Sequence, residues 1–230
     1  PKTAWPPTLS ICQAVKANRG KVIVQVDRLV ATPSRPRNAI IPGCLVDAIV
    51  VAEPQERNEA YMALTGSFEI PYKEWHTWNE KINDLSQKQR KNNIPANIIG
   101  KRAAQELRVD DIVNIGIGIP ETVARFARKS GMLDMITLTV ESGGIGGFPV
   151  SGEAFGAMIG AASVYDMANQ FDLYDNGGLD VCFMGALEVD KYGNINAHRG
   201  TGAFAGIGGF ANITAKTPTV VFCMTFNAKG

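Results

Sequence analysis

The sequence has few of the residues that bind metals or build disulfide frameworks. Its 230 residues include only four cysteines and two histidines, and no two cysteines form a C-x-x-C pair. This spacing argues against zinc ligation and against a disulfide framework, so we expect no metal site. Cysteines scattered in apolar stretches suit a reducing compartment, and we expect the protein in the cytoplasm. The four positions are Cys12, Cys44, Cys182 and Cys223.

An excess of charge of either sign is also absent. Lys and Arg number 23 against 22 Asp and Glu, for a formal net charge of +1. A broad basic field for nucleic acid is therefore not indicated. No apolar run approaches the roughly 20 residues of a membrane-spanning helix. We expect neither nucleic acid nor a membrane as partner, and the 45% hydrophobic content is that of an ordinary globular protein.

Two motifs of common enzyme classes are incomplete. The turn Gly116-Ile117-Gly118 has Glu121 where the dinucleotide motif G-x-G-x-x-G requires its last glycine. Ser151 does not stand in the G-x-S-x-G motif of serine hydrolases. We therefore expect neither a nicotinamide or flavin cofactor nor a serine nucleophile. The glycine turn still offers amides at a helix N-terminus, which suit a carbonyl, carboxylate or phosphate group.

The order of apolar segments predicts an α/β fold. Short β-branched runs alternate with helical periodicity, which favours a mostly parallel sheet with helices on both faces. A hairpin turn is expected at 190–194 and another turn at 171–178, while 152–164 fits either a helix or a loop near a ligand. The expected helices are 8–18, 95–107 and 121–129, and the expected strands are 21–30, 45–51, 111–116, 135–140, 181–187 and 220–226.

Glu141 is the most unusual residue of the chain. It follows the apolar run 135–140 and precedes four glycines within five residues, 143–147. Ligands bind at strand ends in α/β sheets, and glycines there allow close approach to backbone amides. The sequence thus permits a carboxylate presented to a substrate, or a solvated glutamate beside a glycine turn.

Three segments resemble family I coenzyme A transferases. The segment 140–143, V-E-S-G, is similar to the family's catalytic glutamate segment, and 206–210, G-I-G-G-F, to its oxyanion segment. The segment 113–120, V-N-I-G-I-G-I-P, resembles the strand and turn that open the family's β-type half. The three occur in the family's order, and the similarity is closest to single-chain acetate/propionate-type acyl-CoA transferases.

The resemblance implies a CoA-transferase-like fold in which an α-type and a β-type half are fused. It divides the chain into 1–53, the C-terminal part of the α-type half, 54–94, a connecting segment, and 95–230, a β-type half that is incomplete at its C-terminus. We therefore expect a piece of a longer polypeptide that forms a homo-oligomer. The catalytic site would be shared between the halves, so we expect the isolated piece to have little activity.

The resemblance also implies an activity. An acyl-CoA:carboxylate CoA-transferase would work by a ping-pong mechanism through a glutamyl-CoA thioester on Glu141, with coenzyme A as a substrate and no permanently bound cofactor. The acids would be short, such as acetate or propionate. Oxyanion and CoA-proximal amides are expected at Gly206, Gly208, Gly209 and Gly143. The substrate pocket is expected at Asn114, Gly116 and Gly118, and CoA contacts at Asn194, Asn196 and Arg199.

Other interpretations remain open. Asn194 and Asn196 equally fit turn and strand-end capping. An acyl-CoA hydrolase of the same family, in which water resolves the intermediate, is compatible with the sequence, as is a catalytically incomplete fragment. A sugar-phosphate isomerase on a related fold is disfavoured by the E-S-G-G-I-G-G context of Glu141. In the connecting segment, Trp75 and Trp78 are expected to pack, and His76 has no evident acidic or nucleophilic partner for general acid catalysis.

Overall fold

The computed structural model describes residues 7–26, 28–31, 39–53, 93–150, 156–200, 203–204 and 206–226. Most of the expected connecting segment, with Trp75, His76 and Trp78, lies outside these ranges, and so does Ser151. Within the described ranges no helix combines the length and apolar character needed to cross a membrane. All four cysteines are free thiols.

The N-terminal unit contains one helix and a two-stranded parallel sheet. Strand β1 pairs with β2 in a register that runs from Ile23 opposite Ala48 to Val26 opposite Val51. The expected alternation in β1 is confirmed, because Val22 and Val24 are less exposed than Ile23 and Gln25. The elements are α1 (Thr8–Ala17), β1 (Ile23–Val26), η2 (Gly43–Leu45) and β2 (Ala48–Val51).

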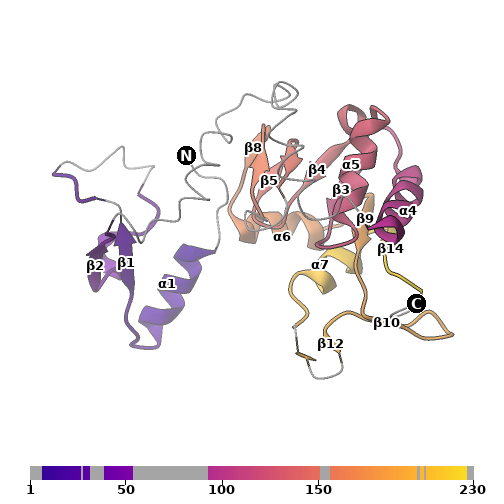
Figure 1. Cartoon of the computed structure of the whole chain (residues 1–230). Helices are drawn as coiled ribbons and strands as arrows, with labels where there is room; N and C mark the ends of the chain where they lie inside the picture. Colours follow the sequence, from indigo (N-terminus) through magenta and orange to yellow (C-terminus); the bar gives the residue numbers. More distant parts are fainter. Residues whose placement is uncertain are drawn as a thin grey trace.

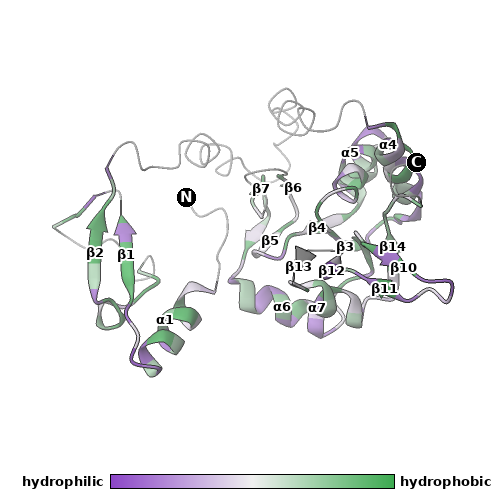
Figure 2. Ribbon diagram, turned by 60° about the horizontal axis from the view of Figure 1, so that its bottom comes forward, coloured by the Kyte–Doolittle hydropathy of each residue, from purple (hydrophilic) through white to green (hydrophobic). Residues whose placement is uncertain are grey.

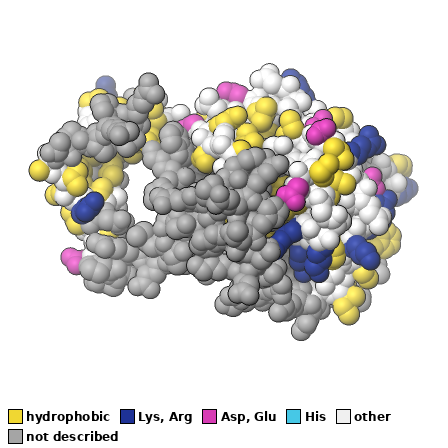
Figure 3. Space-filling model, turned by 90° about the horizontal axis from the view of Figure 1, so that it is seen from above, with side chains coloured by type: hydrophobic (Ala, Val, Ile, Leu, Met, Phe, Trp, Pro, Cys, Tyr) yellow, Lys and Arg dark blue, Asp and Glu magenta, His cyan; other side chains and the backbone are white. Residues whose placement is uncertain are grey.

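The strand expected at 45–51 forms only at Ala48–Val51, and the burial that its apolar sequence suggests is wrong. Leu45 belongs to a 3-10 turn, and β2 is exposed along its whole length, with Ile49 at 56% and Val50 at 49% exposure. A sheet of two strands has too few neighbours to cover these side chains. Figure 2 shows the hydrophobic character of β2, and Figure 3 shows hydrophobic side chains on the surface of this unit.

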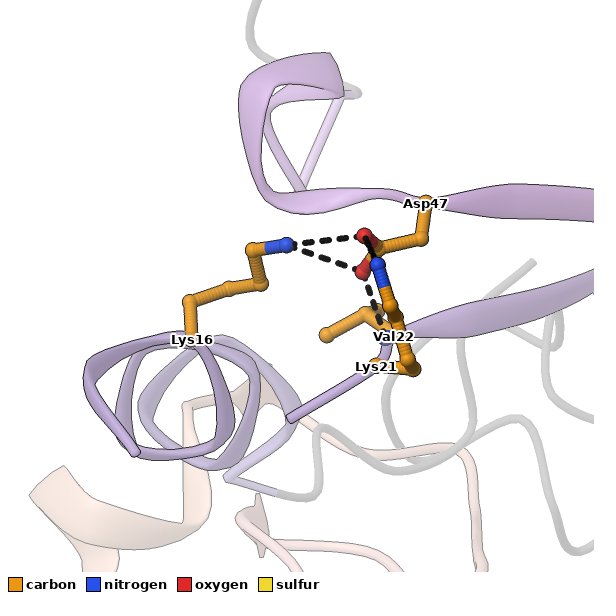
Figure 4. Close-up of polar contacts among 4 residues, drawn as sticks. All are labelled: Lys16, Lys21, Val22 and Asp47. Carbon is orange, nitrogen blue, oxygen red and sulfur yellow. Dashed lines mark hydrogen bonds and ion pairs between the residues drawn. The ribbon is translucent and has the colours of Figure 1, made fainter. Parts of the chain in front are cut away.

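Asp47 joins the helix to the sheet of this unit. Its carboxylate accepts hydrogen bonds from the Val22 N–H at 2.9 Å, from Lys16 Nζ at 2.9 Å and from Lys21 Nζ at 3.1 Å (Figure 4). The Val22 amide first, and then the two ammonium groups, hold the pKa of Asp47 well below its ordinary value of 3.8. One carboxylate thus fixes the end of α1 against the starts of β1 and β2.

We expect Asp47→Asn to loosen this unit selectively. A depressed folded-state pKa means that the stabilisation is fully present above the ordinary pKa of 3.8 and is lost as pH falls below it. The side chains are partly solvated, so the effect is small. Amide hydrogen exchange at Val22 should become faster in the variant at pH 7, and wild type and variant should converge in acid. Asp172→Asn, an exposed site on the other unit, is the matched control. Unchanged exchange at Val22 would contradict this role.

The C-terminal unit is built on a six-stranded sheet with the order β14-β9-β3-β4-β5-β8. The first four strands are parallel, and the short strands β5 and β8 extend the sheet in antiparallel pairing. The elements of this sheet are β3 (Ile112–Ile115), β4 (Thr137–Thr139), β5 (Gly144–Ile145), β8 (Ser163–Val164), β9 (Val181–Met184) and β14 (Thr219–Phe222).

Helices cover both faces of this sheet (Figures 1 and 2). On one face, α4 (Ile94–Ala103) and α5 (Glu121–Lys129) pack on side chains such as Val113 and Leu138. On the other, α6 (Met167–Asp175) and α7 (Phe210–Ala215) pack on Cys182 and Met184. The predicted α/β architecture with a mostly parallel sheet is confirmed. The remaining elements are η5 (Ala104–Glu106), η6 (Met132–Met135), β6 (Phe148–Pro149), β7 (Met158–Ile159), β10 (Glu188–Val189), β11 (Ile195–Asn196), β12 (Arg199–Gly200) and β13 (Ala203–Phe204).

Local signals account for the ends of two helices. The Asn93 side chain accepts a hydrogen bond from the Ala96 N–H at 3.0 Å, and Pro95 occupies the first turn of α4, where its missing N–H is tolerated. Gly131 has φ 75° just after α5, a left-handed conformation that suits glycine. Gly20, in contrast, does not end α1 in this way. The positive φ there belongs to Arg19, at 59°.

The predicted turn at 171–178 is wrong, because most of it is the C-terminal half of α6. Asp166 caps this helix by accepting a hydrogen bond from the Ala168 N–H at 2.9 Å. The helix continues through Tyr174, which is buried against the sheet. The segment 156–164 contains the short strands β7 and β8, so the helix alternative for this region is wrong within the described residues. None of these residues lines the cavity described below.

Candidate active site

Glu141 lies just past the carboxyl end of β4. The turn after it is closed by backbone bonds: the Val140 N–H donates to the Gly144 carbonyl at 2.9 Å, and the Gly143 N–H to the Val140 carbonyl at 3.0 Å. Gly143 has φ 106°, and a Cβ there would meet the backbone of Tyr165, with the carbonyl carbon at 2.9 Å. Glycine is therefore required at this position to hold the turn that presents Glu141.

A cavity of about 790 Å³ opens beside Glu141. Its lining includes the ends of β3, β9 and β14 and the loop before α7. Five of the predicted site residues meet there, although they come from three separate parts of the chain. They are Gly116, Glu141, Gly206, Gly208 and Gly209.

Gly209 lies directly against the Glu141 carboxylate. A Cβ built on Gly209 would meet Oε2 of Glu141, with Cδ of Glu141 at 2.9 Å and Cζ of Phe171 at 2.8 Å. Gly209 has φ −78° and ψ 0°, a conformation open to any residue. The absence of a side chain at this position is therefore explained by close packing against Glu141 and Phe171.

The amides of this loop suit an oxyanion. Among the described residues, the N–H groups of Gly208 and Gly209 form no hydrogen bond, so they are available to a ligand. The N–H of Gly116 is engaged, because it donates to the Phe183 carbonyl at 2.8 Å. The N–H of Gly118 is also engaged, with Oε1 of Glu121 at 3.1 Å. Gly116 and Ile117 thus shape the cavity wall, whereas Gly118 is not among the residues that line it. The amide of Gly118, just before α5, is occupied by the Glu121 carboxylate.

Two other predicted site residues do not reach the cavity. Gly143 is buried in the turn after Glu141, and its N–H is used there. Asn114 is 2% exposed, and its Nδ2 donates to the Tyr174 hydroxyl at 3.2 Å beneath the site. Gly143 and Asn114 therefore hold the backbone and side chains around the site and do not themselves line the cavity.

The predicted CoA contacts lie on the β10–β11 hairpin and the strand after it. The Asn194 side chain donates to Asp190 at 2.7 Å, and the Asn196 side chain donates to Glu188 and to the Arg199 carbonyl, each at 2.6 Å. These bonds hold the hairpin, as the capping interpretation anticipates. Arg199 is exposed, and none of the three is among the residues that line the cavity.

Burial changes the acidity of the candidate nucleophile. Desolvation raises the pKa of Glu141 above its ordinary value of 4.5, because the charged form is disfavoured away from water. A carboxylate that is poorly solvated retains more of its nucleophilic strength than one in bulk water. The site therefore combines a poorly solvated carboxylate with glycine amides that have no hydrogen-bond partner among the described residues.

Sequence reasoning missed Phe171 and Tyr174. Phe171 contributes the apolar edge beside Gly209 and Glu141, and Tyr174 holds Asn114 and Thr139 below them. A helical reading of the segment after Asp166 would have placed both residues, three apart, on one face of α6. The Asp, Asn and Gly residues at 172–178 instead indicated a turn.

The cavity, the strand-end carboxylate and the glycine amides agree with one family. Residues 96–205 match the family model described as Coenzyme A transferase. This part of the chain is therefore similar to the coenzyme A transferase family.

Longer relatives extend the similarity over nearly the whole chain. An acetate CoA-transferase, YdiF, of Escherichia coli is 37% identical over 96% of this chain and 40% of its own length. A caffeate CoA-transferase of Acetobacterium woodii is 37% identical over 96% of this chain and 42% of its own length. The chain thus spans about two fifths of the length of these relatives.

A solved structure has the same fold. The crystal structure of the Escherichia coli acyl-CoA transferase YdiF, in a thioester complex with CoA, matches 100% of this chain and 43% of its own chain, with a TM-score of 0.77 and 30% identity. The CoA-transferase-like fold expected from the sequence is confirmed.

Proposed function

We propose that this chain carries the catalytic glutamate of an acyl-CoA:carboxylate CoA-transferase. The observation that supports it most directly is the Glu141 carboxylate, desolvated at a strand end and packed against Gly209. Within the described part of the chain the Gly209 N–H has no hydrogen-bond partner. The similarity to the coenzyme A transferase family supports the same activity. The complete protein would act on an acyl-CoA and a short carboxylic acid such as acetate or propionate. Its homo-oligomeric form and cytoplasmic location are proposals that rest on the family resemblance and, for the location, on the scattered free cysteines.

The chemistry follows from a carboxylate nucleophile beside amide donors. A Glu141 oxygen attacks the thioester carbonyl of the acyl-CoA, the C–S bond breaks, and an acyl-glutamyl anhydride and CoA thiolate result. The thiolate then attacks the glutamyl carbonyl, which releases the first carboxylate and leaves a glutamyl-CoA thioester. A second carboxylate repeats these two steps in reverse order. Each attack places negative charge on a carbonyl oxygen, and in this proposal the amides of Gly208 and Gly209 stabilise it.

The experiment that tests this is detection of the covalent intermediate. Full-length protein incubated with propionyl-CoA or acetyl-CoA should gain the mass of CoA less water on the peptide containing Glu141. The Glu141→Gln variant should gain none. An adduct on another peptide, or one that persists in the variant, would rule out this assignment of the nucleophile.

A hydrolase of the same family is the second candidate. It would form the same intermediate, but water would resolve it. Adding acetate to the propionyl-CoA reaction separates the two functions: a transferase should produce acetyl-CoA with little free CoA, whereas a hydrolase should release CoA whether or not acetate is present.

A further inference from the structure

Three buried polar side chains form a chain of hydrogen bonds beneath the candidate nucleophile. Asn114 Nδ2 donates to the Tyr174 hydroxyl at 3.2 Å, this hydroxyl donates to Thr139 Oγ1 at 3.0 Å, and Thr139 Oγ1 donates to the Val113 carbonyl at 3.0 Å. Exposure is 2% for Asn114 and Thr139 and 1% for Tyr174. These hydrogen bonds join β3, β4 and α6 through the Tyr174 hydroxyl.

This polar chain lies on the same sheet face as Glu141. Asn114 is directly opposite Thr139 in the β3–β4 register. Glu141 lies beyond the end of β4, and its carboxylate lies beside Phe171 of α6, the helix that covers this face. Tyr174 is close enough that the charge on Glu141 adds to the effect of burial in raising the pKa of the tyrosine. The hydroxyl therefore holds the last residue of the strand that presents the nucleophile.

The same helix also contacts the nucleophile's other neighbour. The Phe171 and Tyr174 rings meet edge to face, with centroids 5.7 Å apart and planes at 72°. Phe171 in turn lies at the point where Glu141 and Gly209 meet. Fixing the Tyr174 ring therefore fixes both the end of β4 and the apolar surface beside the carboxylate.

Apolar side chains at these three positions would fill the same space and would need no hydrogen-bond partners. A buried polar group is costly unless it is hydrogen-bonded, but a bonded chain specifies one geometry. We propose that Tyr174 is a positioning residue whose hydroxyl, held between Asn114 and Thr139, sets the place of the Glu141 carboxylate against Gly209. This inference rests on the proposed function of Glu141.

The test is Tyr174→Phe in the full-length protein, which keeps the ring and removes the hydroxyl. We expect kcat to fall by about 10- to 100-fold with KM nearly unchanged, because small misplacements of reacting groups have effects of this order. The low-pH fall of kcat/KM should also move to lower pH, since a carboxylate that shifts toward water has a lower pKa. Tyr192→Phe, on a side chain that is 78% exposed, is the matched control and should leave kcat unchanged.

Thr139→Val removes the same hydrogen bond from its other partner. It should reproduce the loss of kcat, and the double variant should lose little more than either single one, because both changes break the Tyr174–Thr139 hydrogen bond. If Tyr174→Phe does not fold, Thr139→Val carries the test alone. A lowered melting temperature with unchanged kcat and pH profile would show a purely structural role and overturn the inference. Absence of the CoA adduct in wild type would overturn the proposed function itself, and the inference with it.

Discussion

Replacing Glu141 by Gln should abolish CoA transfer and at the same time stabilise the fold at neutral pH. The amide cannot attack a thioester, so we expect kcat to fall by about 10⁴-fold or more, as for other enzymes that lose their nucleophile. Gln is nearly the same size as Glu, so packing against Gly209 and Phe171 should persist. Steady-state exchange between propionyl-CoA and acetate measures the loss.

The effect on stability follows from the raised pKa of Glu141. Burial makes the folded state favour the protonated carboxyl, so ionisation destabilises the fold as pH rises from 4.5 through the folded-state pKa. Gln carries no such charge. The melting temperature of the variant relative to wild type should therefore increase with pH over this window and then remain constant. A difference that does not vary with pH would mean that Glu141 is not desolvated in the folded protein.

The pH dependence of catalysis has the same origin. Only the carboxylate attacks, so kcat/KM should decline on the acid side below the folded-state pKa of Glu141. Because that pKa is raised by burial, the decline should begin at a higher pH than for an ordinary glutamate.

The sequence predicted the parts of this site that depend on local patterns. The run before Glu141 is apolar and β-branched, the glycines after it form a turn, and alternation of strands and helices implies a parallel sheet. Carboxyl ends of parallel strands meet at one edge, which is why Gly116 and Glu141 lie together. The loop of Gly208 and Gly209 was assigned to the site only through the family resemblance, because no local pattern connects it to Glu141.

Tertiary packing decided what could not be predicted. Composition at 172–178 favours a turn, but the cap at Asp166 begins a helix that α7 and the sheet stabilise, and it extends to Asp175. Conversely, β2 has the sequence of a buried strand but only β1 as its neighbour, so its valines are exposed. Neither outcome is contained in the short-range pattern, because each depends on which elements lie next to the segment.

The contact between Gly209 and Glu141 is a long-range feature of this kind, and it leads to the second large effect. Gly209→Ala should reduce kcat/KM by about 10²-fold, the order expected when a reacting group is displaced by about 1 Å. The methyl group would occupy space now filled by the Glu141 carboxylate and by Cζ of Phe171, at 2.8 Å. Since Gly209 has φ −78°, alanine introduces no backbone strain there. The loss should therefore come from displacement of the nucleophile.

Two neighbouring glycines separate this explanation from general damage to the loop. Gly208 has φ 55°, and a Cβ built there would meet no other atom within 4 Å. Gly208→Ala therefore adds backbone strain but no steric clash, and it measures the effect of strain alone. Gly185 lines the same cavity, and its nearest neighbour to a Cβ is the Ile117 carbonyl at 3.7 Å, an ordinary contact. We expect the largest loss of kcat for Gly209→Ala, with CoA affinity changed less than turnover, and a smaller loss for Gly185→Ala. If Gly185→Ala and Gly209→Ala lose kcat equally, the methyl group at 209 does not act through Glu141. If turnover and CoA affinity fall together in Gly209→Ala, the loop as a whole has collapsed and the contact with the carboxylate is not what requires glycine.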